Sequence, residues 1–164
     1  MVVTARRRAE LLEETPISVT ALSENTLREA GITRIEQIQE MVPNLEMPTG
    51  RSGLEGRIRI RGIGSSGINA GIDPSVGVFI DGVFIGRSGA SAITDMIDIE
   101  RIEVLRGPQG TLYGKNTAAG AISVVSKKPI VNVFEGALEG WIGSYGDRQF
   151  RGSVNVPLLD DRIA

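Results

Sequence analysis

The sequence DIERIEVLRGPQGTLYGKNTAAGAISVVSKK, from Asp98 to Lys128, decides the fold of this chain. It opens with an apolar-rich run from Ile99 to Leu105, which Gly107-Pro108 interrupts. A second run, rich in β-branched residues, follows from Ala121 to Val125. Because glycine favours turns and proline cannot donate a hydrogen bond to a strand, the pattern predicts a strand, a compact connector and a second strand.

Length and composition limit the kind of protein that surrounds this stretch. A chain of 164 residues fits one domain with a short appendage and is long enough to bury a core of its own. Its 18 basic and 20 acidic residues nearly cancel, so no overall field favours nucleic acid, and we expect no nucleic-acid partner. The 21 glycines indicate many turns and close backbone contacts. No apolar run is long enough for a transmembrane helix, and the first residues show no apolar core of an export signal.

The residue types that are missing exclude most catalytic sites. The chain has no Cys and no His, which removes disulfides, a thiol nucleophile, an imidazole base and the usual ligands of zinc and haem. No base, nucleophile and orienting group occur at a recognisable spacing. We therefore expect no enzyme activity, no metal site and no cofactor.

Two helices and a strand are expected near the amino terminus. Residues from Pro16 to Leu22 alternate as in a strand, and Ser23 is placed to cap a helix that ends at Gly31. Thr33, with Glu36 three residues later, predicts a capping box at the start of a second helix. That helix is expected to bury Ile35, Ile38 and Val42.

Two further strand patterns lie before Asp98. Residues 57 to 61 alternate arginine with isoleucine, which predicts a strand with one apolar and one cationic face that needs an anionic partner. Ser75–Ile80 and Val83–Gly86 flank Asp81-Gly82, a dipeptide that suits a type I′ turn. The second pattern therefore predicts a β-hairpin that joins the sheet.

Three motifs have misleading similarities to binding sites. Residues 62 to 67 satisfy GxGxxG, but Gly71 and Pro74 interrupt the helix that would hold a pyrophosphate, so a backbone bend is expected. The stretch from Gly107 to Asn116 has the wrong spacing for a phosphate-binding loop. The carboxylates of Glu100 and Glu103 are expected to pair with Arg101 and Arg106 rather than to bind calcium.

After Pro129 the apolar residues fall on alternate positions of two segments. Phe134, Leu138 and Ile142 share one parity in the first segment, while Phe150, Val154, Val156 and Leu158 share one parity in the second. Each segment is about ten residues long, with Ser144–Asp147 as the turn between them, and this pattern is typical of tilted barrel strands. By itself the periodicity fits an ordinary surface hairpin on a soluble core equally well.

The order of motifs around Gly107 resembles one known family. An ERIEVLRGP strand spans Glu100–Pro108, an LYG turn follows at residues 112 to 114, and a strand begins with Gly120-Ala121-Ile122. This order is similar to the plug domain of TonB-dependent outer-membrane receptors, and the likeness extends from about residue 2 to residue 160.

The resemblance implies an α/β plug domain, with a small mixed β-sheet and short helices, followed by the first two strands of a transmembrane β-barrel. Residues 1–14 would be a TonB-box-like segment and charged tether, 15–129 the plug, and 130–164 the start of the barrel. Since a closed barrel needs at least eight strands, the receptor would be truncated here. The implied location is the outer membrane of a Gram-negative cell, with the plug inside the barrel lumen.

The resemblance also implies roles for particular residues. Val2, Val3, Thr4 and Ala5 look like the TonB box, which adds as a strand to the energy-coupling protein TonB. Arg61 and Arg106 correspond to arginines that pair with barrel glutamates and so latch the plug. The other matched positions are structural: Gly62, Asp81, Gly82, Glu100, Arg101, Glu103, Gly107, Pro108, Gly110, Leu112, Tyr113, Gly114 and Gly120.

The implied function is energy-coupled uptake of a scarce nutrient, with a ferric siderophore as the first expectation and cobalamin or a saccharide as others. Loops at Pro48–Gly56, Ser65–Asp73 and Gly86–Thr94 are expected to face the ligand, because their Gly, Ser and Asn content suits exposed apices. The alternative is a stand-alone soluble α/β binding or interaction domain, or a receptor fragment without function.

Overall fold

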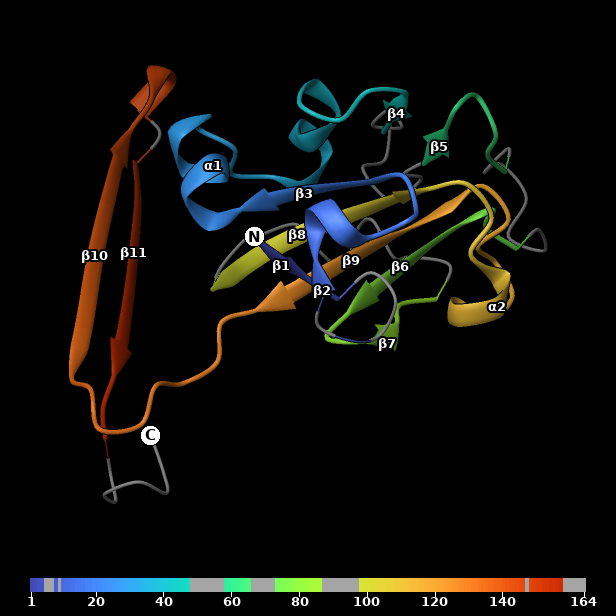
Figure 1. Ribbon diagram of the computed structural model, residues 1–164. Coiled ribbons are helices and arrows are strands. Elements are labelled where there is room, and N and C mark those ends of the chain that lie inside the picture. Colours follow the sequence, from blue (N-terminus) through green and yellow to red (C-terminus); the bar gives the residue numbers. More distant parts are fainter. Residues whose placement is uncertain are drawn as a thin grey trace. The chain divides into compact units, whose positions relative to one another are not determined.

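Two antiparallel strands form the centre of a five-stranded sheet (Figure 1). In the computed structural model, which describes residues 1–4, 8, 10–47, 58–65, 73–86, 98–146 and 148–157, these strands are β8 (Ile99–Arg106) and β9 (Gly120–Ser126). The prediction of two strands around Gly107-Pro108 is therefore confirmed. Ala5, Arg57, Leu158 and most of the three expected ligand loops lie outside the described residues.

The sheet is mixed. Its strand order is β3-β8-β9-β6-β7, and the flanking strands are β3 (Val19–Ser23), β6 (Val76–Ile80) and β7 (Val83–Phe84). Only β6 and β9 pair in parallel, while the other three neighbouring pairs of this sheet are antiparallel. This agrees with the mixed sheet expected for a plug domain.

The chain divides into two units, Met1–Ser126 and Lys127–Ala164. Besides the five-stranded sheet, the first unit has two small antiparallel pairs, β1 (Val2–Val3) with β2 (Glu10–Leu11) and β4 (Leu45–Glu46) with β5 (Arg59–Ile60). Its helices are η1 (Leu12–Glu14), α1 (Glu24–Glu29), η2 (Ile35–Glu40) and α2 (Gly110–Tyr113).

The second unit holds β10 (Glu135–Ile142), η3 (Ser144–Gly146) and β11 (Arg148–Asn155). In the part of the chain that the structure describes, no helix is long and apolar enough to cross a membrane.

The two expected helices form, but the second has a different cap. The Ser23 hydroxyl accepts a hydrogen bond from the Thr26 amide at 3.2 Å, as predicted. The capping box of Thr33 with Glu36 is wrong: Gln37 Oε1 accepts from the amides of Thr33, at 2.8 Å, and Arg34, at 2.9 Å. This happens because the cap residue is Arg34, one residue later than predicted, and the short 3₁₀ helix begins at Ile35, which places Gln37 three positions after the cap residue. Ile35, Ile38 and Val42 are buried, as expected.

Both faces of the sheet are covered, because side chains alternate along β8 and β9. Ile102 and Val104 point into a large cluster that includes Ile35 and Ile38 of η2. Leu105, on the other parity, packs in a smaller cluster whose buried members are Val3, Phe79, Leu105, Tyr113 and Ala121. The second face of the sheet is therefore covered in part by the amino-terminal strand, which lies in front of β8 and β9 in Figure 1.

The turn between β6 and β7 has the predicted geometry and a second role. Asp81 and Gly82 have φ values of 48° and 82°, as a type I′ turn requires. Asp81 Oδ1 accepts from the Ser126 amide at 2.9 Å, and Oδ2 accepts from its hydroxyl at 2.6 Å. The end of β9 is thus tied to the tip of the hairpin.

Gly120 provides a test of the packing at the centre of the sheet. A Cβ at this position would lie 2.3 Å from the carbonyl oxygen of Leu105 and 2.7 Å from Ile60 Cδ1. We predict that Gly120→Ala lowers the free energy of unfolding by about 1–3 kcal/mol, measured by urea denaturation followed by circular dichroism. The control is Gly110→Ala, where a Cβ meets nothing within 4 Å and a change within about 0.5 kcal/mol is expected. Equal midpoints for the two variants would contradict the close approach of β8 and β9.

Candidate functional site

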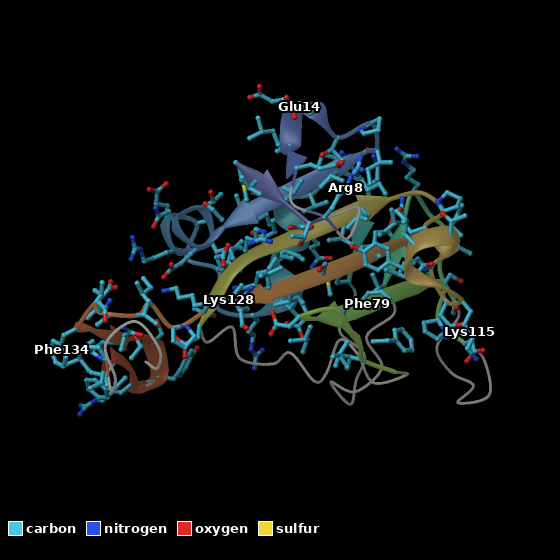
Figure 2. The ribbon with its side chains drawn as sticks, turned by 60° about the horizontal axis from the view of Figure 1, so that its bottom comes forward. Arg8, Glu14, Phe79, Lys115, Lys128 and Phe134 are labelled. Atoms are coloured by element: carbon cyan, nitrogen blue, oxygen red, sulfur yellow. The ribbon has the colours of Figure 1, made fainter. Side chains whose placement is uncertain are left out.

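The amino-terminal strand lies against the sheet. Val2 is 50% exposed, whereas the neighbouring Val3 is 1% exposed and packs in the smaller cluster. The expected solvated tether, residues 6–14, contributes β2 and η1 where it is described. Figure 2 shows this amino-terminal segment, which carries Arg8 and Glu14, as a layer over one face of the sheet. Burial of Val3 gives the segment an apolar anchor.

A polar contact lies next to this anchor, and we call its three residues, Thr4, Arg101 and Glu103, the Thr4 clasp. Glu103 Oε1 accepts hydrogen bonds from the Thr4 amide at 2.7 Å and from the Thr4 hydroxyl at 3.1 Å. The same oxygen accepts from Arg101 Nε at 2.8 Å, and Arg101 Nη2 donates to the Thr4 hydroxyl at 3.1 Å. These contacts join the chain's fourth residue to the middle of β8.

The alternation of β8 explains how the clasp is built. Arg101 and Glu103 are two residues apart, so both side chains leave the same face of the strand. The strand neighbours of Glu103 are small, Ala21 on β3 and Ser123 on β9, which leaves room above the sheet for its carboxylate and for Thr4. Glu103 has no solvent exposure, and a buried carboxylate needs charge pairing and hydrogen bonds. Arg101 supplies the opposite charge and Thr4 supplies two donors, all to Oε1, whereas Oε2 is buried and has no hydrogen-bond partner among the described residues.

The sequence predicted only part of this ion pairing correctly. Glu100 and Glu103 were predicted to form ion pairs with Arg101 and Arg106. This is wrong for Arg106, because Arg101 pairs with both carboxylates. Arg101 can do so since its guanidinium has donors on two edges. The contact with Thr4 was not expected from sequence, and the only local signal for it is a carboxylate on a strand that is otherwise buried.

The two arginines assigned to the latch lie at the same end of β8. A Cβ built on Gly107 would lie 3.8 Å from Arg61 Nη1, so the Arg61 side chain reaches the turn that follows Arg106. Arg106 Nε is buried and has no hydrogen-bond partner among the described residues. Within that same part of the chain, neither arginine forms an ion pair, while Arg59 on the preceding strand contacts Glu46 at 3.6 Å. This end of the unit therefore presents positive charge that lacks a described anionic partner.

Most of the other matched motif positions shape the connector between β8 and β9, while Gly62 lies in the turn after β5. Gly62, Gly107 and Gly114 have positive φ values of 73°, 112° and 79°, which glycine adopts without strain. Gly110 begins α2, Pro108 is exposed, and Leu112 is 38% exposed. Tyr113 packs edge-on against Phe79, with ring centroids 4.8 Å apart, and Figure 2 labels Phe79 at this place. These residues hold the turn in shape and offer no reactive group.

The second unit is a two-sided hairpin. Leu138 and Phe150 share one face with Gly152 and Gly140 opposite them, whereas the other face carries polar pairs such as Glu135 with Asn155. Phe134, Leu138, Ile142, Phe150 and Val154 are each at least 68% exposed. The two predicted amphipathic strands are present, each with eight residues rather than about ten.

Comparisons with known proteins give the family. A model of the TonB-dependent receptor plug domain matches residues 11–121. A pesticin receptor from Yersinia pestis is 29% identical over 161 residues, covering 98% of this chain and 23% of the relative. A vitamin B12 transporter from Vibrio vulnificus is 32% identical over 130 residues, covering 77% of this chain and 20% of the relative. The chain thus spans less than a quarter of the length of these relatives.

A solved structure gives the same result. The ferric yersiniabactin uptake receptor from Yersinia pestis superposes with a TM-score of 0.79 at 30% identity, over 88% of this chain and 22% of that receptor. These relatives are receptors and transporters, not enzymes. With a family model that matches more than half of its residues, this chain belongs to the plug domains of TonB-dependent receptors of the outer membrane.

Proposed function

We propose that this chain is the plug and coupling portion of a receptor that imports a scarce nutrient across the outer membrane, with energy supplied through TonB. The first candidate ligand is a ferric siderophore, because similar proteins include a ferric yersiniabactin uptake receptor and a catecholate siderophore receptor. Cobalamin is the second candidate, because another relative is a vitamin B12 transporter. We assign residues 1–14 to coupling, 15–129 to the plug and 130–164 to the start of the barrel wall.

The observation that carries this proposal is the Thr4 clasp. TonB recognition by strand addition needs an extended peptide with main-chain groups to pair. Val2 and Val3 form such a segment with Thr4 after them, while Ala5 lies outside the described residues. The clasp joins this segment to β8, so a pull on it acts directly on the central strand of the plug.

The unpaired arginines support the latch assigned to Arg61 and Arg106. A plug inside a hydrated lumen must be held by polar contacts that can be released. Two cations at one end of the unit suit carboxylates on a surrounding wall, where ion pairs are screened less than on an open surface. We assign the complementary carboxylates to barrel strands outside this chain.

The hairpin supports assignment of residues 130–164 to a barrel wall. Large apolar side chains occupy one face of β10 and β11 and stay exposed, while the opposite face carries the polar pair of Glu135 with Asn155 and pairs Ala137 with Ser153. That alternation is what lipid on one side and a polar lumen on the other require.

The complete receptor gene, expressed in cells that lack other siderophore and cobalamin receptors, tests the function. We predict that the cells accumulate radiolabelled iron from a ferric siderophore. Removal of residues 2–5 should abolish accumulation and leave surface binding intact, because binding precedes energy coupling. Binding of neither ferric siderophores nor cobalamin, or accumulation that persists without residues 2–5, would contradict the proposal.

The latch predicts opposite effects of one substitution in two settings. Arg106→Met keeps the length of the side chain and removes a buried donor that has no described partner. In this chain alone we expect the free energy of unfolding to rise by about 1 kcal/mol, measured by urea denaturation. In the complete receptor the same change should weaken retention of the plug, measured as antibiotic leakage through the barrel. Arg59→Met is the control, since an exposed ion pair contributes at most about 1 kcal/mol. A less stable chain with Arg106→Met would show that Arg106 already has its partner.

The barrel assignment predicts that charge is tolerated on one face of the hairpin only. In the complete receptor, Leu138→Arg should cost about 2–4 kcal/mol of folding free energy in lipid vesicles if Leu138 lies near the bilayer midplane. Ser153→Arg, next to the Gly152 that pairs with Leu138 but on the opposite face, should change it far less. Folding is measured by urea titration in the presence of the vesicles. Equal losses in the two variants would remove the lipid-facing assignment.

A further inference from the structure

We propose that Glu103 competes with the partner strand for one main-chain donor, the Thr4 amide, and so controls access to the free edge of β1. This inference rests on the proposed function, because it concerns how the same coupling segment is recognised. It assigns a specific regulatory contact to a carboxylate of the plug's central strand.

The register of β1 and β2 shows which donors face outward. Val2 pairs with Leu11 and Val3 with Glu10, and the Leu12 amide donates to the Met1 carbonyl at 3.0 Å. Hydrogen-bonding direction alternates along an antiparallel strand, so the main-chain groups of Met1 and Val3 face β2. Those of Val2 and Thr4 therefore face the opposite edge, which is the one that remains for an added strand.

The Thr4 amide on this edge is already engaged. It donates to Glu103 Oε1 at 2.7 Å, a charge-assisted bond of the stronger kind. A partner strand that adds to β1 would need the same amide for its own carbonyl. Glu103 and the partner therefore cannot both bind Thr4, and burial of Val3 at 1% exposure hinders access further.

Arg101 makes release of Thr4 compatible with an intact plug. When Thr4 leaves, Glu103 Oε1 loses two of its three donors among the described residues but keeps the bond from Arg101 Nε at 2.8 Å. A buried carboxylate without any partner would destabilise the sheet, and the paired arginine prevents this. The clasp can therefore open and close without unfolding β8.

The chain has no Cys, so single cysteines report on the clasp directly. In the complete receptor, Val3→Cys should react slowly with a thiol reagent and Val2→Cys quickly, because their exposures are 1% and 50%. Adding Glu103→Gln, which replaces a charged acceptor by a neutral one, should accelerate labelling at position 3 roughly tenfold and leave position 2 unchanged. Glu100→Gln is the matched control, since Glu100 also pairs with Arg101 but does not hydrogen-bond the Thr4 amide, which donates to Glu103.

Affinity for the soluble periplasmic domain of TonB, measured by titration calorimetry, tests the competition itself. A binding-competent state that becomes more populated raises the apparent affinity by the same factor. Glu103→Gln should therefore bind TonB roughly tenfold more tightly than the parent receptor, and Glu100→Gln should bind like the parent. Faster labelling without tighter binding would overturn the proposal.

Two substitutions of Thr4 test the role of its amide and leave the buried ion pair of Arg101 with Glu103 unchanged. Thr4→Val removes the hydroxyl and keeps the amide, so labelling at position 3 should rise and TonB should bind more tightly. Thr4→Pro removes the amide as well, so labelling should rise while TonB binds more weakly than to Thr4→Val. Equal TonB affinities for these two variants would overturn the proposal, even if Glu103→Gln failed to fold.

The labelling and the titration together distinguish failure of the proposed coupling function from failure of the proposed competition. If no variant binds TonB but Glu103→Gln still accelerates labelling at position 3, the proposed coupling function fails and the competition is overturned with it, while the clasp remains as a structural contact. If TonB binds and labelling at position 3 is fast in the parent receptor, the coupling function stands and the competition alone is refuted.

Discussion

A carboxylate with no solvent exposure lies in the middle of β8, and the hydrogen bonds of its Oε1 organise one face of the plug, while its Oε2 has no partner among the described residues. Glu103 is surrounded by small strand neighbours, paired with Arg101 and bonded to Thr4. A leucine at this position would bury more apolar surface without any of these requirements, and buried ion pairs contribute little net stability compared with apolar packing. The carboxylate instead gives a specific place on the sheet where the amino-terminal strand binds.

Other groups in the chain also lack partners within the described residues. Arg106 has a buried donor without a bond, and the Arg61 side chain, which reaches Gly107, has no described ion pair. In the described part of the second unit, Phe134, Leu138, Ile142, Phe150 and Val154 are each at least 68% exposed. Each of these features is unfavourable in a self-contained domain, and each matches a surface that a surrounding barrel and a lipid bilayer would supply.

Much of the fold could be predicted because its determinants are local. Gly107-Pro108 separates β8 from β9, Asp81-Gly82 forms the expected turn, and Ser23 caps α1. The errors came where two neighbouring residues could make the same contact. Gln37 rather than Glu36 caps the start of the second helix, and Arg101 alone pairs with both Glu100 and Glu103. The Thr4 clasp could not be predicted, because Thr4 and Glu103 are 99 residues apart and no periodicity reports such a contact. The family's motifs indicated which strand matters, and only the structure showed what that strand binds.

The most direct test of this account is amide hydrogen exchange at Thr4, measured by nuclear magnetic resonance and normalised to an unstructured peptide of the same sequence. The Thr4 amide is bonded to a buried carboxylate, whereas the Val2 amide faces the free edge of β1. The account predicts that Thr4 exchanges at least about tenfold more slowly than its peptide reference while Val2 exchanges near its own reference rate. Exchange of Thr4 at the peptide rate would show that Glu103 does not hold the amino-terminal strand.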